Sequence, residues 1–104
     1  MKWGNMQPQR TEWHWEEADK LVDFCEQHGL RLKGHTLVWH NQMPSWVTEG
    51  LTAQELRAEV LEHVTATVAR YKGRIPAWDV VNEVRARAAS TACAPPREWT
   101  HLDV

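Results

Sequence analysis

The sequence predicts an α/β fold in which parallel strands are joined by crossover helices. Two segments carry apolar residues at helical spacing, and a short β-prone segment follows each of them. Such a helix, strand, helix, strand order implies strands that run in the same direction. Ligands of parallel α/β folds bind at the carboxyl ends of strands, so the residues found there are the first candidates for a functional site.

The first helix is predicted over residues Trp15 to His28, where apolar side chains recur at i, i+3, i+4 and i+7. Gly29 follows where a left-handed cap would end the helix. Cys25 falls on the apolar face, so we expect it to pack in the core. The next segment, Leu30 to Trp39, mixes alternation with an apolar end and predicts a strand that runs into a loop.

The second helix has a well-marked start, because Thr52 and Glu55 have the spacing of a capping box. Apolar residues then keep helical spacing as far as Gly73. The β-prone segment Ile75 to Val81 predicts the second strand, which ends at an Asn-Glu pair.

Composition narrows the function classes. The 104 residues have a formal net charge of −2 with interspersed charges, so no basic stripe indicates a nucleic-acid partner. No apolar run approaches the roughly 20 residues that cross a bilayer, and the first residues do not open a signal peptide. Two cysteines, Cys25 and Cys93, are too few for a disulfide framework. Seven tryptophans suit stacking against sugar rings, although they could equally fill a core or an interface.

Glu83 is the first candidate for chemistry. A carboxyl group at the end of an apolar strand loses hydration, which favours its protonated form, as a general acid requires. The neighbouring Asn82 supplies an amide that can hydrogen-bond a sugar hydroxyl. The alternative is that this Asn-Glu pair merely caps the following segment, and spacing alone favours that alternative.

A second candidate group lies at or just beyond the end of the first strand, where His35, Trp39 and His40 fall within six residues. Two histidines could bind a metal, but no HExxH pattern or cysteine pair supplies further ligands. Hydrogen-bonding histidines around a sugar pocket are the favoured interpretation, with structural core histidines as the alternative. We therefore expect neither a metal nor another cofactor.

Beyond these patterns, five blocks of the sequence resemble the xylanases of glycoside hydrolase family 10. Their order and approximate spacing also match, and together they cover residues 1 to 83. The blocks are Met1-Lys2-Trp3, Trp15 to Val22, Gly34 to Trp46, Arg70 to Gly73 and Trp78 to Glu83.

The resemblance implies a (β/α)8 barrel of which residues 1–83 span about the end of strand two through strand four. By the family's pattern Glu83 is the acid/base catalyst, and Asn82 holds the 2-hydroxyl of the sugar at the cleavage point. Lys2 and His35 hydrogen-bond sugars on the non-reducing side, and Trp39 forms a wall of that pocket. The implied partner is xylan or a xylo-oligosaccharide, and the complete protein is expected to be secreted. Oligomeric state is not indicated.

The resemblance also implies a retaining double displacement, which needs a second carboxylate about 5 Å from the acid. In the family this nucleophile lies in a Thr-Glu-Leu-Asp pattern on strand seven, and we expect it to be missing here. Thr100 to Val104 echoes that pattern but follows Glu83 too closely to be strand seven. Residues 84–104 are expected to form an irregular tail, and its Ala, Arg and Pro bias suggests a reading-frame slip or a truncation. The amino end is expected to be truncated too, because the family has a further strand and a Glu-Asn pair before Met1.

Three functional hypotheses remain at this point. The first is a fragment of an endo-1,4-β-xylanase that is inactive in isolation and poorly soluble. The second is a non-catalytic remnant that binds xylan or oligosaccharides through Lys2, His35, Trp39 and Asn82. The third, a metal-dependent hydrolase that uses His35 and His40, is the least favoured.

Overall fold

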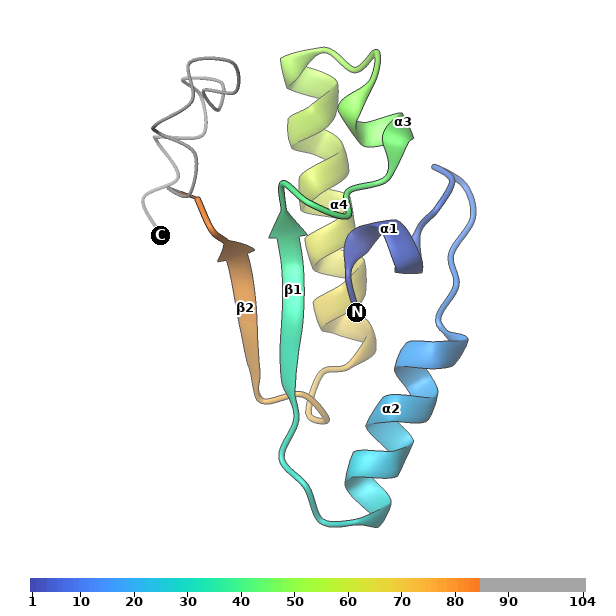
Figure 1. Cartoon of the computed structure of the whole chain (residues 1–104), viewed down its shortest axis with the longest axis vertical. Coiled ribbons are helices and arrows are strands. Elements are labelled where there is room, and N and C mark those ends of the chain that lie inside the picture. The colour runs from blue at the N-terminus through green and yellow to red at the C-terminus, as the bar shows by residue number, and fades with distance from the viewer. Residues whose placement is uncertain (85–104) are drawn as a thin grey trace.

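The computed structural model describes residues 1–84, which form four helices and two strands (Figure 1). The expectations for Cys93, for Thr100 to Val104 and for the rest of the tail from residue 85 lie outside the described residues. In chain order the elements are α1 (Trp3–Met6), α2 (Glu16–Gln27), β1 (Lys33–Trp39), α3 (Ser45–Thr48), α4 (Ala53–Arg70) and β2 (Ala77–Asn82).

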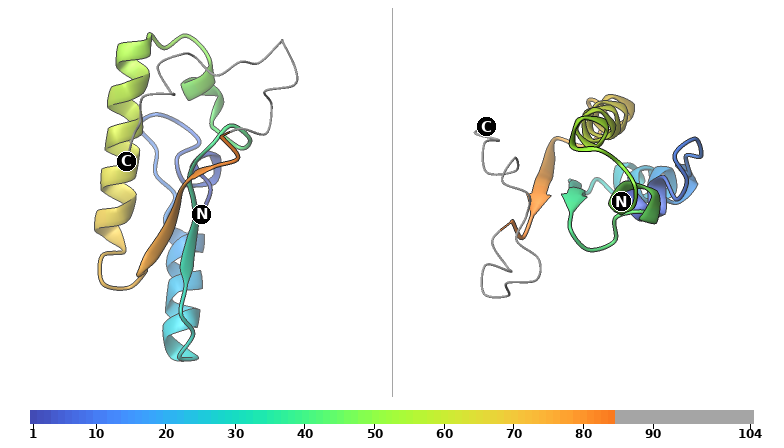
Figure 2. Two further views of the ribbon diagram at one scale, coloured as in Figure 1. Left: turned by 90° about the vertical axis from the view of Figure 1, so that its left-hand side faces the viewer. Right: turned by 90° about the horizontal axis from the view of Figure 1, so that it is seen from above.

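The two strands pair in parallel, which confirms the predicted direction of the chain. Strand β1 lies between β2 on one side and α1 and α2 on the other, while α4 runs alongside the sheet (Figures 1 and 2). The pairing runs from Lys33 beside Ala77 to Trp39 beside Asn82. Both carboxyl ends therefore lie next to each other at one end of the sheet.

The ladder between the strands contains one irregularity. His35 pairs with Asp79 and Val38 pairs with Val81, so β1 advances three residues where β2 advances two. One extra residue in β1 bends the strand locally, as β-bulges do. The Thr36 hydroxyl donates to the backbone carbonyl of Asp79 at 2.9 Å within this irregularity, and the peptide bond between His35 and Thr36 is cis.

Helix α2 matches the prediction to within one residue at each end. Gly29 adopts the left-handed conformation (φ 64°) that ends the helix. Ala18 and Val22 are buried in a cluster that also contains the side chains of Tyr71 and Ile75. Cys25 is buried and free, as expected for a core cysteine. The cluster fixes α2 against the segment that joins α4 to β2.

Helix α4 begins with the predicted capping box. The Glu55 N–H donates to the Thr52 hydroxyl at 3.2 Å, and the Thr52 N–H donates to the Glu55 carboxylate at 3.1 Å. The residues that α4 buries are nevertheless polar: Glu59, His63 and Thr67. Glu59 forms an ion pair with Arg10, so its charge is compensated. Neither α4 nor any other helix within residues 1–84 is long and apolar enough to span a membrane.

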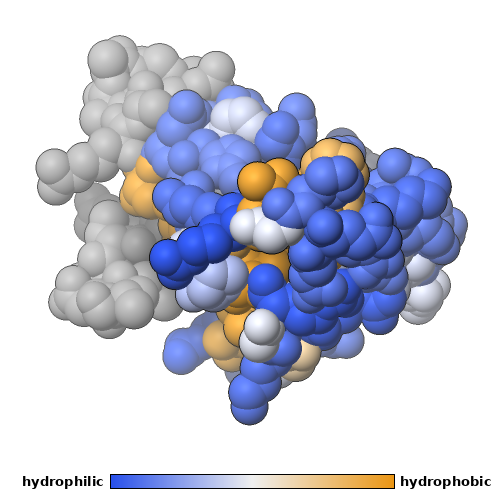
Figure 3. Space-filling model, turned by 90° about the horizontal axis from the view of Figure 1, so that it is seen from below, coloured by the Kyte–Doolittle hydropathy of each residue, from blue (hydrophilic) through white to orange (hydrophobic). Residues whose placement is uncertain are grey.

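Strand β2 carries apolar side chains that are largely exposed. Val80 and Val81 alternate in direction along the strand, and they are 48% and 40% exposed. Val84 just beyond the strand is exposed too, as are Leu21 and Phe24 on α2. Apolar surface is visible in orange between hydrophilic side chains in the view from below (Figure 3). Parallel strands are normally covered on both faces, so β2 has uncovered apolar surface of the kind a larger α/β fold buries.

Candidate active site

Three predicted site residues meet at the carboxyl end of the sheet, whereas His35, which was expected there too, lies within β1, four residues before that end. Trp39 is the last residue of β1, and it lies beside Asn82, the last residue of β2. Glu83 follows with a left-handed backbone conformation (φ 55°), which is uncommon for a residue other than glycine. The indole N–H of Trp39 donates to Oε2 of Glu83 at 2.9 Å. The strand ends thus bring Trp39 into direct contact with the candidate acid.

Lys2 joins this group from the amino end of the chain. It precedes the short helix α1, and its Nζ atom lies 5.6 Å from the centroid of the Trp39 ring, which is a cation–π distance. Helix α1 is fixed to the loop after β1, because the Gly4 N–H donates to the Gln42 carbonyl at 2.9 Å. A Cβ atom at Gly4 would lie 2.7 Å from that carbonyl oxygen, so glycine permits the close approach.

His35 lies next to Trp39, with 6.3 Å between the ring centroids. Its Nδ1 atom is 3.0 Å from Oδ2 of Asp79. Since a carboxylate only accepts, Nδ1 donates this bond and leaves Nε2 for another partner. Lys33 approaches the other Asp79 oxygen at 2.6 Å. The hydrogen bonds from Lys33 and then from His35 hold the pKa of Asp79 below its usual value.

Asp79 was missed among the candidates from sequence, although it orients His35. Two features of the sequence could have identified it. Asp79 lies next to the centre of the predicted strand, and it precedes Glu83 by four residues. A charged residue inside a short apolar strand needs a partner, and its partner lies on the neighbouring strand. Which partner this is depends on the register, which the sequence alone does not give.

The surroundings of Glu83 differ from the expectation. Its side chain is exposed, so the loss of hydration predicted for it is absent within residues 1–84. Glu83 is exposed because few other residues of this range pack against the end of β2. Among the hydrogen bonds and ion pairs of the described residues, Trp39 is the one partner of the Glu83 carboxylate. Asn82 is half-buried beside it.

No group of three or more His, Cys, Asp or Glu side chains in the described part of the chain is arranged to hold a metal ion. The His40 ring lies edge-on to Trp39, with 6.0 Å between centroids. His35 is engaged by Asp79, as described above. The two histidines of the third hypothesis therefore have other neighbours in the structure.

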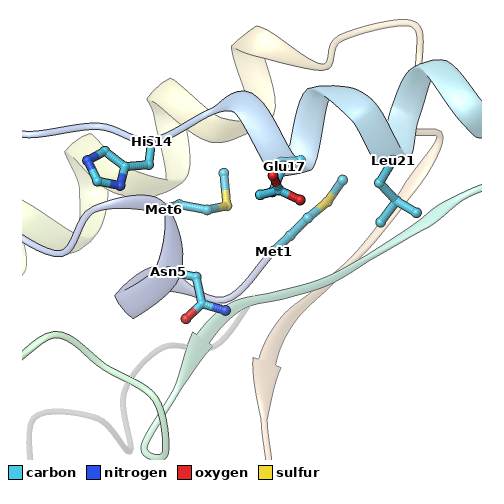
Figure 4. A pocket seen from close by; sticks show the side chains of 7 residues that line it. Met1, Asn5, Met6, His14, Glu17 and Leu21 are labelled. Atoms are coloured by element: carbon cyan, nitrogen blue, oxygen red, sulfur yellow. The ribbon is translucent and has the colours of Figure 1, made fainter.

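A cavity of about 190 Å³ lies apart from these residues, between α1 and the start of α2 (Figure 4). None of the five predicted site residues lines it. Its walls are made by Met1, Asn5, Met6, His14, Glu17, Ala18 and Leu21.

Comparison with known proteins explains the arrangement. Residues 1–96 match the model of glycosyl hydrolase family 10. The chain belongs to this family. Over 84 residues it is 46% identical to endo-1,4-beta-xylanase 3 of Hypocrea jecorina. This alignment covers 81% of this chain and 24% of that relative. It is 47% identical over 83 residues to a beta-1,4-xylanase of Dictyoglomus thermophilum, covering 80% of this chain and 23% of the relative.

Solved structures give the same result. The fold is similar to that of xylanase 10B from Thermotoga petrophila in complex with xylobiose, with a TM-score of 0.77 and 42% identity. That match covers 80% of this chain and 26% of the other. The chain thus spans about a quarter of the length of these family members. The resemblance inferred from the five sequence blocks is confirmed at the level of the family.

Proposed function

We propose that this chain supplies the acid/base half of a retaining endo-1,4-β-xylanase site. In this proposal β1 and β2 are strands three and four of a (β/α)8 barrel. The single observation that carries it is the contact between Trp39 and Glu83 at the carboxyl ends of two parallel strands, where active sites of such barrels lie. Two relatives that are 46% and 47% identical to this chain are xylanases, which supports the same substrate class.

In the proposed mechanism Glu83 protonates the departing glycosidic oxygen and later removes a proton from water. A second carboxylate on the opposite side of the bond attacks the anomeric carbon. Asn82 holds the 2-hydroxyl of the sugar that is cleaved, next to the acid. Lys2 and the free Nε2 of His35 hydrogen-bond the preceding sugars, while the Trp39 ring forms the wall against which those sugars lie.

A second candidate function is binding of xylo-oligosaccharides without turnover. One observation favours it: Lys2, His35 and Trp39 are already assembled beside Glu83 in the described part of the chain. Double displacement requires both carboxylates. For the 104-residue chain by itself we therefore expect weak binding of sugar and little or no hydrolysis.

The test uses xylohexaose and the wild-type chain, with Glu83→Gln as the site variant. Glu62→Gln is the matched control, because Glu62 is an exposed glutamate on α4. Binding is followed by tryptophan fluorescence and calorimetry, and hydrolysis by the release of reducing ends. We expect binding by all three proteins and at most traces of hydrolysis that Glu83→Gln removes. Failure of the wild-type chain to bind would overturn the proposal, as would hydrolysis that persists in Glu83→Gln.

A further inference from the structure

His63 is a buried polar residue with no place in the proposed chemistry. It lies in the middle of α4, its side chain is 1% exposed, and its Nε2 atom is 3.0 Å from the backbone carbonyl of Leu37 in β1. A carbonyl oxygen only accepts, so Nε2 carries the hydrogen and Nδ1 carries a lone pair. Burial lowers the pKa of His63 to about 4, and the ring is neutral at neutral pH.

Two indoles hold the His63 ring in a fixed plane. The Trp3 ring is stacked on it with 4.2 Å between centroids and 9° between planes. The Trp13 ring is parallel to it to within 8°, with 5.9 Å between centroids. Tilting the imidazole out of this plane would break both stacking contacts, and within the plane the hydrogen bond to the Leu37 carbonyl selects the orientation in which Nε2 faces β1.

Two of the residues that contact the His63 ring, Leu37 and Trp3, are close in sequence to candidate site residues. Leu37 stands within the irregular part of the ladder, two residues before Trp39. Trp3 directly follows Lys2, whose Nζ atom lies over the Trp39 ring. A bulge redirects the side chains that follow it, so the group that holds the bulge carbonyl influences the direction of Trp39.

The unsatisfied atom of His63 argues against a purely space-filling role. Its Nδ1 atom is buried and has no hydrogen-bond partner among the described residues. A buried polar atom without a partner destabilises the folded chain, whereas an apolar residue of similar size avoids this cost. A residue whose only role was to fill the space between Trp3 and Trp13 would have no need of the imidazole.

We propose that His63 is a positioning residue, which sets Trp39 and Lys2 against Glu83 through the Leu37 carbonyl and the Trp3 ring. The importance of this positioning for sugar binding rests on the function proposed above. The positioning of Trp39 itself is a property of the free chain, and it can be measured without any sugar.

The test compares His63→Gln, which keeps an N–H donor, with His63→Leu, which has no donor and similar bulk. The primary measurement is the indole N–H resonance of Trp39 in the full chain, assigned with Trp39→Phe and shown to report on Glu83 by its shift in Glu83→Gln. We expect the resonance to stay in place in His63→Gln and to move in His63→Leu toward the position seen in Glu83→Gln. For xylohexaose we expect His63→Leu to lose about tenfold in affinity and His63→Gln about twofold at most.

Thr67→Val is the control, because Thr67 lies one turn further along the same buried face of α4 and its hydroxyl oxygen also has no hydrogen-bond partner within residues 1–84. It should leave the Trp39 resonance unchanged. An unchanged resonance in His63→Leu, or equal shifts in both His63 variants, would overturn the positioning role. Should His63→Leu not fold, the nitrogen shifts of the wild-type imidazole decide: a hydrogen on Nε2 supports the proposal and a hydrogen on Nδ1 refutes it. A wild-type chain with the expected resonance but no sugar binding would refute the proposed function instead.

Discussion

The Trp39 indole donates a hydrogen bond to the Glu83 carboxylate across the ends of two parallel strands, at 2.9 Å. One side chain thus offers both a flat face to a ligand and a donor to the candidate acid. Neither strand could supply this pair alone, because the two residues are 44 positions apart. The parallel pairing is therefore what creates the site.

Replacing Trp39 with Phe tests this dual role. Phenylalanine keeps an apolar ring but loses stacking area and the N–H donor, so we expect affinity for xylohexaose to fall about tenfold. Trp46→Phe is the matched control, since the Trp46 N–H donates to the backbone carbonyl of Gln7 instead. Calorimetric titration measures both. Equal losses in the two variants would show that Trp39 has no special part in binding.

Gly34 of β1 lies directly under the Trp78 ring of β2. A Cβ atom at Gly34 would lie 2.1 Å from Cε3 of Trp78, so Gly34→Ala forces the ring or the strand to move. We expect a loss of about 1 to 3 kcal/mol in the free energy of unfolding by urea, which is typical of overpacking. Trp78→Leu in the same chain should recover part of that loss. Strictly additive effects in the double variant would rule out this steric explanation.

Asp19 of α2 connects that helix to the end of α4. Its Oδ1 atom accepts from Arg70 Nε at 3.0 Å and from the Tyr71 hydroxyl at 2.8 Å, and the Arg70 hydrogen bond is the main reason that the pKa of Asp19 is lowered. We expect Asp19→Asn to lower the free energy of unfolding by about 1 to 2 kcal/mol. Glu17→Gln, which removes an exposed pair with Lys20, should cost about 0.5 kcal/mol or less. Similar costs for both would contradict this role of Asp19.

Stability should depend on pH through His63. Its pKa is about 4 in the folded chain and about 6.5 when exposed, so the unfolded chain binds the proton first as the pH falls. The neutral His63 ring therefore contributes fully to the free energy of unfolding above pH 6.5. This contribution, on the order of 3 kcal/mol in total, is lost as the pH falls from 6.5 to 4. Urea midpoints across this range measure it. His63→Gln should flatten the curve there, and an unchanged slope would exclude His63 as the cause.

Local sequence signals predicted a large part of the fold. The capping box at Thr52, the left-handed cap at Gly29 and the two apolar periodicities each depend on residues close in sequence, and they placed α2 and α4 correctly. The parallel strands followed from the order of these elements. The helices α1 and α3 were not predicted, because four residues are too few to establish a periodicity.

The parts that could not be predicted depend on contacts between distant residues. Periodicity pointed to an apolar face of α4, but the helix buries Glu59 and His63, whose partners are Arg10 and the Leu37 carbonyl. The same limit applies to Asp79, whose partner follows from the register. The assembly of site residues at the strand ends was foreseeable from topology. Their individual roles came from the family resemblance, and they stay predictions.

The two strands differ in how much of the structure packs against them. Strand β1 contacts β2, α1 and α4 and accepts the His63 hydrogen bond, whereas within residues 1–84 β2 has β1 as its one paired neighbour and exposes Val80 and Val81. Segments with little buried apolar surface open at lower free energy, so amide hydrogens of β2 exchange with solvent before those of β1. Trp39 thus belongs to the slowly opening strand and Glu83 to the rapidly opening one. When the pair separates, it is the carboxylate that departs and the indole that stays.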